Sequence, residues 1–341
     1  MKQQSLDTIF GRPPKTLAVQ NGRLEVFDFF CGAGGFSEGA RAAGCSVVYA
    51  CDNNEDALET HRRNHPDAQH VCASLPIESI PFPTDGRRFH VHGSPPCQKL
   101  SVCNQRDATS DAVLKATNMV DWFVRMALAS GAESWTMEEV ASAELTSVLE
   151  NVKKEFKGKV AYDTFKCEEL GIPQMRKRLV AGTPALIAKL QRLRHRFPKR
   201  TVRDVIAKPR GTHLRGTKSC VGMRKKANPQ PGEAKFTYTK AGMGDNCVSI
   251  DRPSPTLPTH GVTWITKEQG KKAHSRIPLN KKEYAAIQTF PANYKWPPGE
   301  KIARRQIGNA VPPFLAELIL RPEGEVSAPR CASPSLVLCP E

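Results

Sequence analysis

Residues 24–53 read LEVFDFFCGAGGFSEGARAAGCSVVYACDN, and this stretch is the strongest indication of the fold. An apolar run ends in the glycine-rich turn Cys31–Gly35, a short helix follows, and a second apolar run ends at Asp52. Glycines let the backbone approach a ligand, and a carboxylate at the tip of the second strand accepts hydrogen bonds from ribose hydroxyls. The turn suits a nucleoside cofactor such as NAD, FAD or S-adenosylmethionine, although Ser37 stands where the dinucleotide pattern has its third glycine.

Strand and helix patterns continue to alternate beyond this stretch. Strands are expected over 24–30, 45–51, 88–92, 134–140, 160–167 and 178–182, with another ending near Cys72. Helices are expected over 36–43, 54–64, 112–130 and 143–157. Such alternation is typical of a doubly wound, largely parallel α/β sheet. The sequence therefore predicts a Rossmann-like α/β fold.

The alternation stops near Ala188. Residues 207–243 are rich in Gly, Pro, Lys and Arg, while 201–206 and 236–239 have strand-like composition, which favours a small domain over a linker. Two further helices are expected, over 281–290 and 312–320. These features predict a large domain of residues 22–187 plus 280–322, a small loop-rich domain of residues 188–279, and flexible termini at 1–21 and 323–341.

The basic charge of the chain is concentrated in the small domain. The protein has 341 residues and a net charge of +16. Residues 188–279 hold 21 Lys and Arg against five Asp and Glu, which accounts for the whole excess. A basic segment on a neutral partner is typical of a protein that docks on a polyanion. The candidate contacts in its exposed loops are Arg210, Arg215, Arg224, Lys225 and Lys226.

Cysteine usage and hydropathy exclude several classes of protein. The eleven cysteines are odd in number and include no C-x-x-C pair, which favours a reducing compartment over a disulfide scaffold or a zinc site. The sequence has no run of about 18 apolar residues and no secretory signal near Met1. No metal and no membrane partner are expected.

One cysteine occupies a distinctive position. Gly93-Ser94-Pro95-Pro96-Cys97-Gln98 follows an expected strand, so Cys97 lies on a stiff loop at the edge of the sheet where ligands bind. A thiolate there is a candidate nucleophile, while a structural cysteine is the competing interpretation.

Five motifs together resemble one family. They are Asp28-Phe29-Phe30-Cys31-Gly32-Ala33-Gly34-Gly35-Phe36, Pro95-Pro96-Cys97-Gln98, Gln174-Met175-Arg176-Lys177-Arg178, Arg252-Pro253-Ser254-Pro255-Thr256 and Gly308-Asn309-Ala310-Val311-Pro312. In this order, they resemble the motifs of the DNA (cytosine-5)-methyltransferase family over nearly the whole chain. The resemblance implies a Rossmann-like methyltransferase domain, a basic target-recognition domain at 188–279, and DNA methylation of the kind found in restriction-modification.

The resemblance also implies a mechanism and a set of site residues. Cys97 adds to carbon 6 of a flipped-out cytosine, an acid acts at ring nitrogen 3, and Arg178 binds the carbonyl oxygen with Arg176 nearby. The methyl donor is S-adenosylmethionine. The residues implied for its pocket are Phe30, Gly32, Ala33, Gly34, Gly35, Asp52, Asn53, Pro96 and Asn309.

The sequence departs from the family pattern in two places. The family's Glu-Asn-Val motif appears as Glu138-Glu139-Val140, with Glu in place of Asn. A literal Glu150-Asn151-Val152 lies inside an expected helix, whereas Glu138 ends a strand, so Glu138 is the expected acid. The Asp that usually follows the third strand is missing around Cys72.

Two other functions compete with a DNA methyltransferase. A transfer-RNA cytosine-5 methyltransferase shares these motifs but has a short insert, and an inactive homologue that only binds nucleic acid is supported by Glu139 alone. The expected partner is double-stranded DNA, read over about two to four base pairs that include a guanine. The protein is expected to be a monomer, cytoplasmic at the nucleoid if bacterial, or in the host cell or its nucleus if viral.

Overall fold

The structure is a computed structural model that describes residues 22–96, 110–206, 209, 213–215, 247–259, 262–266 and 275–327. The chain divides into two units. The first comprises residues 1–164, 178–191 and 316–321, and the second comprises 165–177, 192–315 and 322–341. The expected functional domains, 22–187 plus 280–322 and 188–279, stay a prediction.

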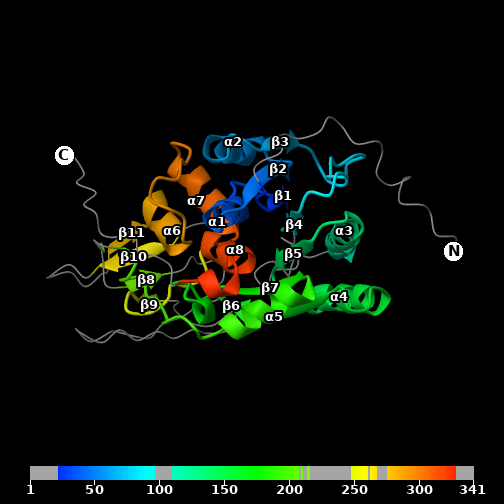
Figure 1. The fold of residues 1–341 in the computed structure, drawn as a ribbon. Coiled ribbons are helices and arrows are strands. Elements are labelled where there is room, and N and C mark those ends of the chain that lie inside the picture. The colour runs from blue at the N-terminus through cyan, green and yellow to red at the C-terminus, as the bar shows by residue number, and fades with distance from the viewer. Residues whose placement is uncertain are drawn as a thin grey trace. The chain divides into compact units, whose positions relative to one another are not determined.

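The first unit is built on a mixed sheet with the strand order β3-β2-β1-β4-β5-β7-β6 (Figure 1). The strands are β1 (Glu25–Phe29), β2 (Ser46–Asp52), β3 (Gln69–Cys72), β4 (Phe89–Gly93), β5 (Ser134–Glu139), β6 (Ala161–Lys166) and β7 (Lys177–Gly182). The pairs from β3 to β5 are parallel, and β7 runs antiparallel to β5. The predicted doubly wound, largely parallel sheet is confirmed, with one antiparallel strand near its edge.

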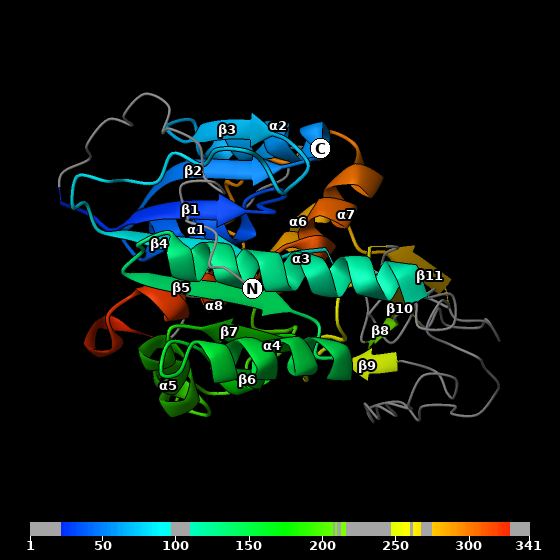
Figure 2. The same cartoon turned by 90° about the vertical axis from the view of Figure 1, so that its right-hand side faces the viewer.

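Helices follow these strands, the first four where the sequence predicts them and the fifth where no helix was expected. They are α1 (Gly35–Ala42), α2 (Glu55–Asn64), α3 (Ser110–Ala129), α4 (Ala143–Glu155) and α5 (Pro184–Leu193). Figure 2 shows α3 and α4 side by side along one face of the sheet. Polar side chains fix where two of these helices begin: Asn54 accepts from the amide of Ala57 at 3.0 Å, and Ser142 accepts from that of Leu145 at 3.2 Å.

The core under α3 is aromatic. Phe27, Phe29, Phe89 and Phe123 are fully or almost fully buried. Phe27 stacks on Tyr49 with ring centroids 5.6 Å apart, and Phe29 meets Phe123 edge to face at 6.3 Å. Because side chains alternate along a strand, Phe27 and Phe29 of β1 face this core together.

The second unit holds a four-stranded sheet with the order β11-β10-β8-β9. Its strands are β8 (His213–Arg215), β9 (Cys247–Ser249), β10 (Thr263–Thr266) and β11 (Ser275–Pro278), and all three pairs are antiparallel. Helices α6 (Lys281–Ile287), α7 (Glu300–Asn309) and the start of α8 (Pro313–Leu320) belong to the same unit. A capping box between Asn280 and Glu283 begins α6.

Three sequence-based expectations need correction. The alternation does not end at Ala188, because α5 continues through it to Leu193. The strand expected over 201–206 is wrong: Asp204 accepts from the amide of Thr201 at 2.7 Å and closes a turn. Helix α7 was not expected at all. The segment expected as a strand over 236–239 lies outside the described residues.

Candidate active site

The glycine turn leaves the carboxyl end of β1 in an uncommon backbone conformation. Phe30, Gly32 and Gly34 have φ values of 55°, 53° and 89°. Positive φ costs a glycine little and other residues more, which explains why glycine stands at two of these three positions. The turn ends where α1 begins, with Gly34 as its N-cap. Backbone amides at the start of α1 therefore lie at the carboxyl edge of the sheet, where α/β proteins bind ligands.

Asp52 links the end of β2 to this turn. Its Oδ2 accepts from the amide of Gly32 at 2.9 Å, and its Oδ1 accepts from the amide of Asn54 at 2.8 Å. Burial raises the pKa of Asp52, and the hydrogen bonds from backbone amides act in the opposite direction. Asn53 beside it is exposed. The expected pairing of the glycine turn with a carboxylate at the tip of the second strand is thus present in the fold.

A network of buried polar side chains links α1 to β1, α2 and β3. Ser37 donates to Asp28 at 2.6 Å and lies 2.9 Å from Nε2 of His61, whose Nδ1 lies 2.8 Å from Nε2 of His70. Burial raises the pKa of Asp28 to about 7 and holds the pKa of His61 well below its usual range. No role was expected for Asp28 or His61 from the sequence, although His61 shares the buried stripe of α2 with Ala57 and Leu58.

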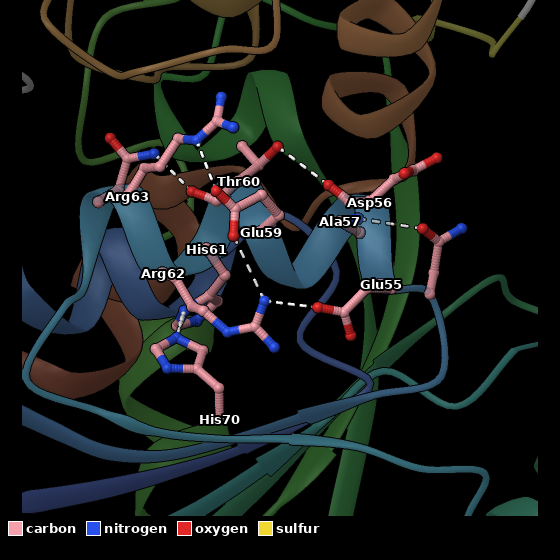
Figure 3. A network of polar contacts seen from close by, with 11 residues as sticks. Glu55, Asp56, Ala57, Glu59, Thr60, His61, Arg62, Arg63 and His70 are labelled. Carbon is pink, nitrogen blue, oxygen red and sulfur yellow. Dashed lines mark hydrogen bonds and ion pairs between the residues drawn. The ribbon is translucent and has the colours of Figure 1, made fainter.

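Figure 3 shows the solvent-facing side of α2. Arg62 donates to Glu55 at 2.6 Å, and Arg63 donates to Glu59 at 2.9 Å. These groups are exposed, so the pairs contribute little to stability. In the same view, His61 and His70 lie beneath these ion pairs, at the outer end of the network of buried polar side chains.

The end of β4 leads into the motif that carries Cys97. A Cβ on Gly93 would lie 2.3 Å from Cε2 of Phe123, so only glycine fits there. The amide of Ser94 donates to the carbonyl of Phe29 at 3.2 Å, which extends the pairing with β1. Pro95 is buried and Pro96 is exposed, while Cys97 itself lies outside the described residues.

Glu138 lies at the carboxyl end of β5 and forms an ion pair. Its Oε1 lies 3.1 Å from Nε of Arg178, and Glu138 is 5% exposed. The register of β4 and β5 pairs Gly93 with Met137, so Ser94 and Glu138 follow on neighbouring parallel strands. The fold thus brings the expected acid beside the start of the Cys97 motif.

The two other glutamates of this region have separate partners. Glu139 is buried, and its Oε2 accepts from the amide of Val140 at 2.6 Å. Glu150 lies on α4, where its carboxylate accepts from the hydroxyl of Tyr162. As expected, Glu150 belongs to a helix and Glu138 to the end of a strand.

Three motifs distant in sequence meet in the second unit. Gln174 donates to Gln288 at 2.6 Å and accepts from the amide of Leu257 at 3.1 Å. The amide of Met175 donates to the carbonyl of Ser254 at 2.7 Å.

Buried Arg176 belongs to the same cluster and donates to the carbonyl of Gly308 at 3.1 Å, next to Asn309 at the end of α7. A Cβ on Gly308 would lie 3.1 Å from the carbonyl oxygen of Pro258, so the backbones approach closely.

Several expected DNA contacts have no described side chain. Arg210, Arg224, Lys225 and Lys226 lie outside the described residues, and Arg215 is described only as the end of β8. Within the part of the chain that is described, no three His, Cys, Asp or Glu side chains form a group that could hold a metal ion. None of the described helices is both long and apolar enough to cross a membrane.

The fold and the site together define a Rossmann-like enzyme class, in which a glycine turn and a strand-tip carboxylate hold a nucleoside cofactor. The family model of C-5 cytosine-specific DNA methylase matches residues 24–322. The chain therefore belongs to the C-5 cytosine-specific DNA methylase family, and it is a DNA (cytosine-5)-methyltransferase with S-adenosylmethionine as methyl donor.

The similarity to known proteins extends over most of the chain. The Type II methyltransferase M.HgiDI of Herpetosiphon aurantiacus is 27% identical over 306 residues, covering 86% of this chain and 92% of the relative. The Type II methyltransferase M1.HphI of Haemophilus parahaemolyticus is 27% identical over 334 residues, covering 87% and 85%. A crystal structure of a protein encoded within an E. coli prophage has a TM-score of 0.58 at 20% identity. It covers 87% of this chain and 97% of its own, and supports the fold alone.

Proposed function

We propose that this enzyme methylates carbon 5 of a flipped-out cytosine in a short sequence of duplex DNA, through a covalent adduct with Cys97. The observation that carries the proposal is the buried ion pair of Glu138 and Arg178, 3.1 Å apart, beside the strand end that leads to Cys97. A carboxyl group and a planar donor at that edge suit the two polar positions of a cytosine ring.

The nucleoside part of the donor fits the edge formed by β1 and β2. The half-buried carboxylate of Asp52 is oriented by two backbone amides and suits ribose hydroxyls. A Cβ on Gly32 would meet nothing within 4 Å, so the turn leaves room for a ligand. S-Adenosylmethionine supplies an electrophilic methyl group when bound. The residues we assign to holding it are Phe30, Gly32, Ala33, Gly34, Gly35, Asp52, Asn53, Pro96 and Asn309.

The chain's own residues supply the other steps. The Cys97 thiolate forms a bond to carbon 6, and Glu138 holds a proton at ring nitrogen 3, which draws electron density away from the carbon under attack. Arg178 donates to the carbonyl oxygen, with Arg176 as a supporting residue. After methyl transfer, the carbon-5 proton leaves and the bond to Cys97 breaks. The base has to leave the duplex, because a stacked cytosine exposes neither face to the thiol.

The basic segment 188–279 is our candidate for the DNA-reading domain. Its charge excess suits phosphate contacts, and Arg210, Arg215 and Arg224 are the candidates for reading guanine, with Lys225 and Lys226 on phosphates. Two short loops supply few base contacts, so a site of about two to four base pairs is expected. The relatives are named as Type II methyltransferases, which supports a role in bacterial restriction-modification. We infer that the enzyme acts as a monomer in the cytoplasm.

The test uses wild-type enzyme and Cys97→Ser. Wild type is expected to form a covalent adduct with DNA containing 5-fluorocytosine, because fluorine cannot leave as a proton does. Cys97→Ser is expected to lose methyl transfer and the adduct while still binding DNA and donor. Bisulfite sequencing of a plasmid treated with wild type gives the recognition site. Turnover by Cys97→Ser, or no adduct with wild type, would contradict the mechanism; a consensus of six or more pairs would contradict the short site.

A further inference from the structure

Two buried histidines on β4 form a polar ladder with β5. His90 and His92 lie two residues apart and therefore face the same side of the sheet. Nδ1 of His90 lies 2.8 Å from Oγ of Ser134, and its Nε2 lies 2.9 Å from Oγ1 of Thr136. Nδ1 of His92 lies 3.0 Å from the same Thr136 oxygen, and its Nε2 lies 3.2 Å from Oγ of Ser94. The ladder thus runs from the start of β5 to the first residue beyond β4.

Both rings are neutral in the folded protein. His90 and His92 are 0% and 1% exposed. Burial lowers the pKa of His90 to about 3 and holds the pKa of His92 well below its usual range. A neutral imidazole donates from one nitrogen and accepts at the other, and the Thr136 hydroxyl has one proton to donate. Each ring nitrogen nevertheless has a hydroxyl partner within 3.2 Å, so the ladder is satisfied along its length.

The ring of His92 also contacts the cofactor side of the site. Phe36 stacks on it with centroids 3.4 Å apart and planes 2° from parallel. Phe36 directly follows the glycine turn, at the start of α1. His92 therefore touches the glycine-turn segment through its ring face and the Cys97 motif through its Nε2 edge. An apolar side chain could keep the first contact but would remove the second.

We propose that His92 is a positioning residue for Cys97, acting through Ser94. Ser94 is held twice, by its amide on the carbonyl of Phe29 and by its hydroxyl on His92. Pro95 and Pro96 follow, and proline fixes φ and restricts the residue before it. Because the two prolines restrict the backbone, the orientation of Ser94 determines the orientation of Pro96, the residue that precedes Cys97.

A small rotation of the backbone at Ser94 produces a large displacement of Pro96, the residue before Cys97. From Ser94 to Pro96 the chain spans about 7 Å, so a swing of about 10° at Ser94 moves the far end by about 1 Å. Misplacement of a reacting group by about 1 Å can cost about 100-fold in rate. A single hydrogen bond at Ser94 is thus enough to change the rate of attack on the base.

The proposal rests on the role of Cys97 given above, and a matched set of full-length variants tests it. His92→Leu removes the contact with Ser94. His90→Leu is the control, because it removes the same functional group from an equally buried site on the same strand and leaves the contact between His92 and Ser94 intact. The measurements are the KM for DNA and for donor, kcat, the melting temperature, and the single-turnover rate of the 5-fluorocytosine adduct.

We expect kcat and the adduct rate of His92→Leu to fall about tenfold or more, with the KM for DNA within about twofold of wild type. His90→Leu should keep kcat within about twofold of wild type although its melting temperature falls similarly. Ser94→Ala should reproduce the loss in kcat, and Ser94→Thr, which keeps the hydroxyl, should largely restore it. The double variant His92→Leu with Ser94→Ala should be no slower than the slower single variant.

Three outcomes would overturn the proposal: normal kcat in Ser94→Ala, equal loss in His90→Leu and His92→Leu, or multiplicative losses in the double variant. Ser94→Ala keeps the test decisive even where His92→Leu fails to fold, because it removes one half-buried hydroxyl. Absence of an adduct with wild type would instead contradict the role of Cys97, so the two failures are distinguishable.

Discussion

At the scale of single residues, Glu138 and Glu150 are the two candidates for the carboxylate that acts on the cytosine. Glu138 ends a buried strand and pairs with Arg178, whereas Glu150 is half exposed on α4 and binds the hydroxyl of Tyr162. The literal motif match at Glu150 belongs to the surface of a helix. A buried, paired carboxylate at the carboxyl edge is the better candidate for acid catalysis, because its surroundings are fixed before the substrate arrives.

Glu138→Gln is expected to lower kcat by a factor on the order of 100, because the amide cannot supply the proton at ring nitrogen 3. Glu150→Gln is the matched control and should keep kcat within about twofold, since an amide oxygen still accepts from Tyr162. Initial rates of transfer from labelled S-adenosylmethionine to DNA give both numbers. A large loss in Glu150→Gln with a normal Glu138→Gln would show that the acid belongs to α4.

At the scale of secondary-structure elements, the contact between β4 and α3 sets where the Cys97 motif begins. The ring of Phe123 fills the space above Gly93. Its Cε2 lies 2.3 Å from the position that a Cβ on Gly93 would occupy. Phe123 is itself completely buried, and its ring meets that of Phe29 on β1 edge to face. The packed interior leaves the ring little room to withdraw, so the strand has to carry glycine at this position.

Gly93→Ala is therefore expected to lower the free energy of unfolding by about 1–3 kcal/mol, the usual cost of overpacking a core. Phe123→Leu alone should also destabilise, because it removes aromatic contacts. Combined with Gly93→Ala, it should cost less than the sum of the two, since the smaller side chain makes room for the new methyl group. Urea unfolding of the four proteins measures the cycle, and strict additivity would contradict the contact.

At the scale of the whole molecule, charge is distributed unevenly along the chain. The net charge of +16 belongs to residues 188–279, and the remaining residues are neutral in sum. Such a distribution favours a single docking segment over a diffuse attraction for DNA. We therefore expect the release of counterions from DNA to make affinity depend steeply on salt through that segment.

Replacing Lys225 and Lys226 by Ala is expected to reduce the slope of log affinity against log salt by about 1.8, or about 0.9 for each phosphate that no longer binds a lysine. Lys154 and Lys157 are exposed lysines outside the basic segment and provide the matched control, which should leave the slope unchanged. Fluorescence anisotropy with duplex DNA over a series of salt concentrations measures both. An unchanged slope in the Lys225 and Lys226 variant would count against these two lysines as phosphate-binding residues.

Local pattern was enough to predict much of this protein. The strand before the glycine turn, the spacing from Gly32 to Asp52 and the helix placement of Glu150 follow from the sequence, and the structure shows each of them. These features depend on residues close in sequence, whose periodicity and turn chemistry act before any tertiary contact forms. The family resemblance then supplied the chemistry.

Contacts between segments distant in sequence account for what local pattern could not predict. The antiparallel pairing of β7 with β5, the pKa of Asp28 and the meeting of Gln174 with Gln288 follow from which strands and helices become adjacent. The strand-like composition of 201–206 was overridden by the turn closed by Asp204. The histidine ladder shows the reason most clearly. In the sequence, His92 is one of two histidines in the alternating stretch Phe89-His90-Val91-His92-Gly93. Its role appears only when β5 places Thr136 beside it and α1 covers its ring with Phe36.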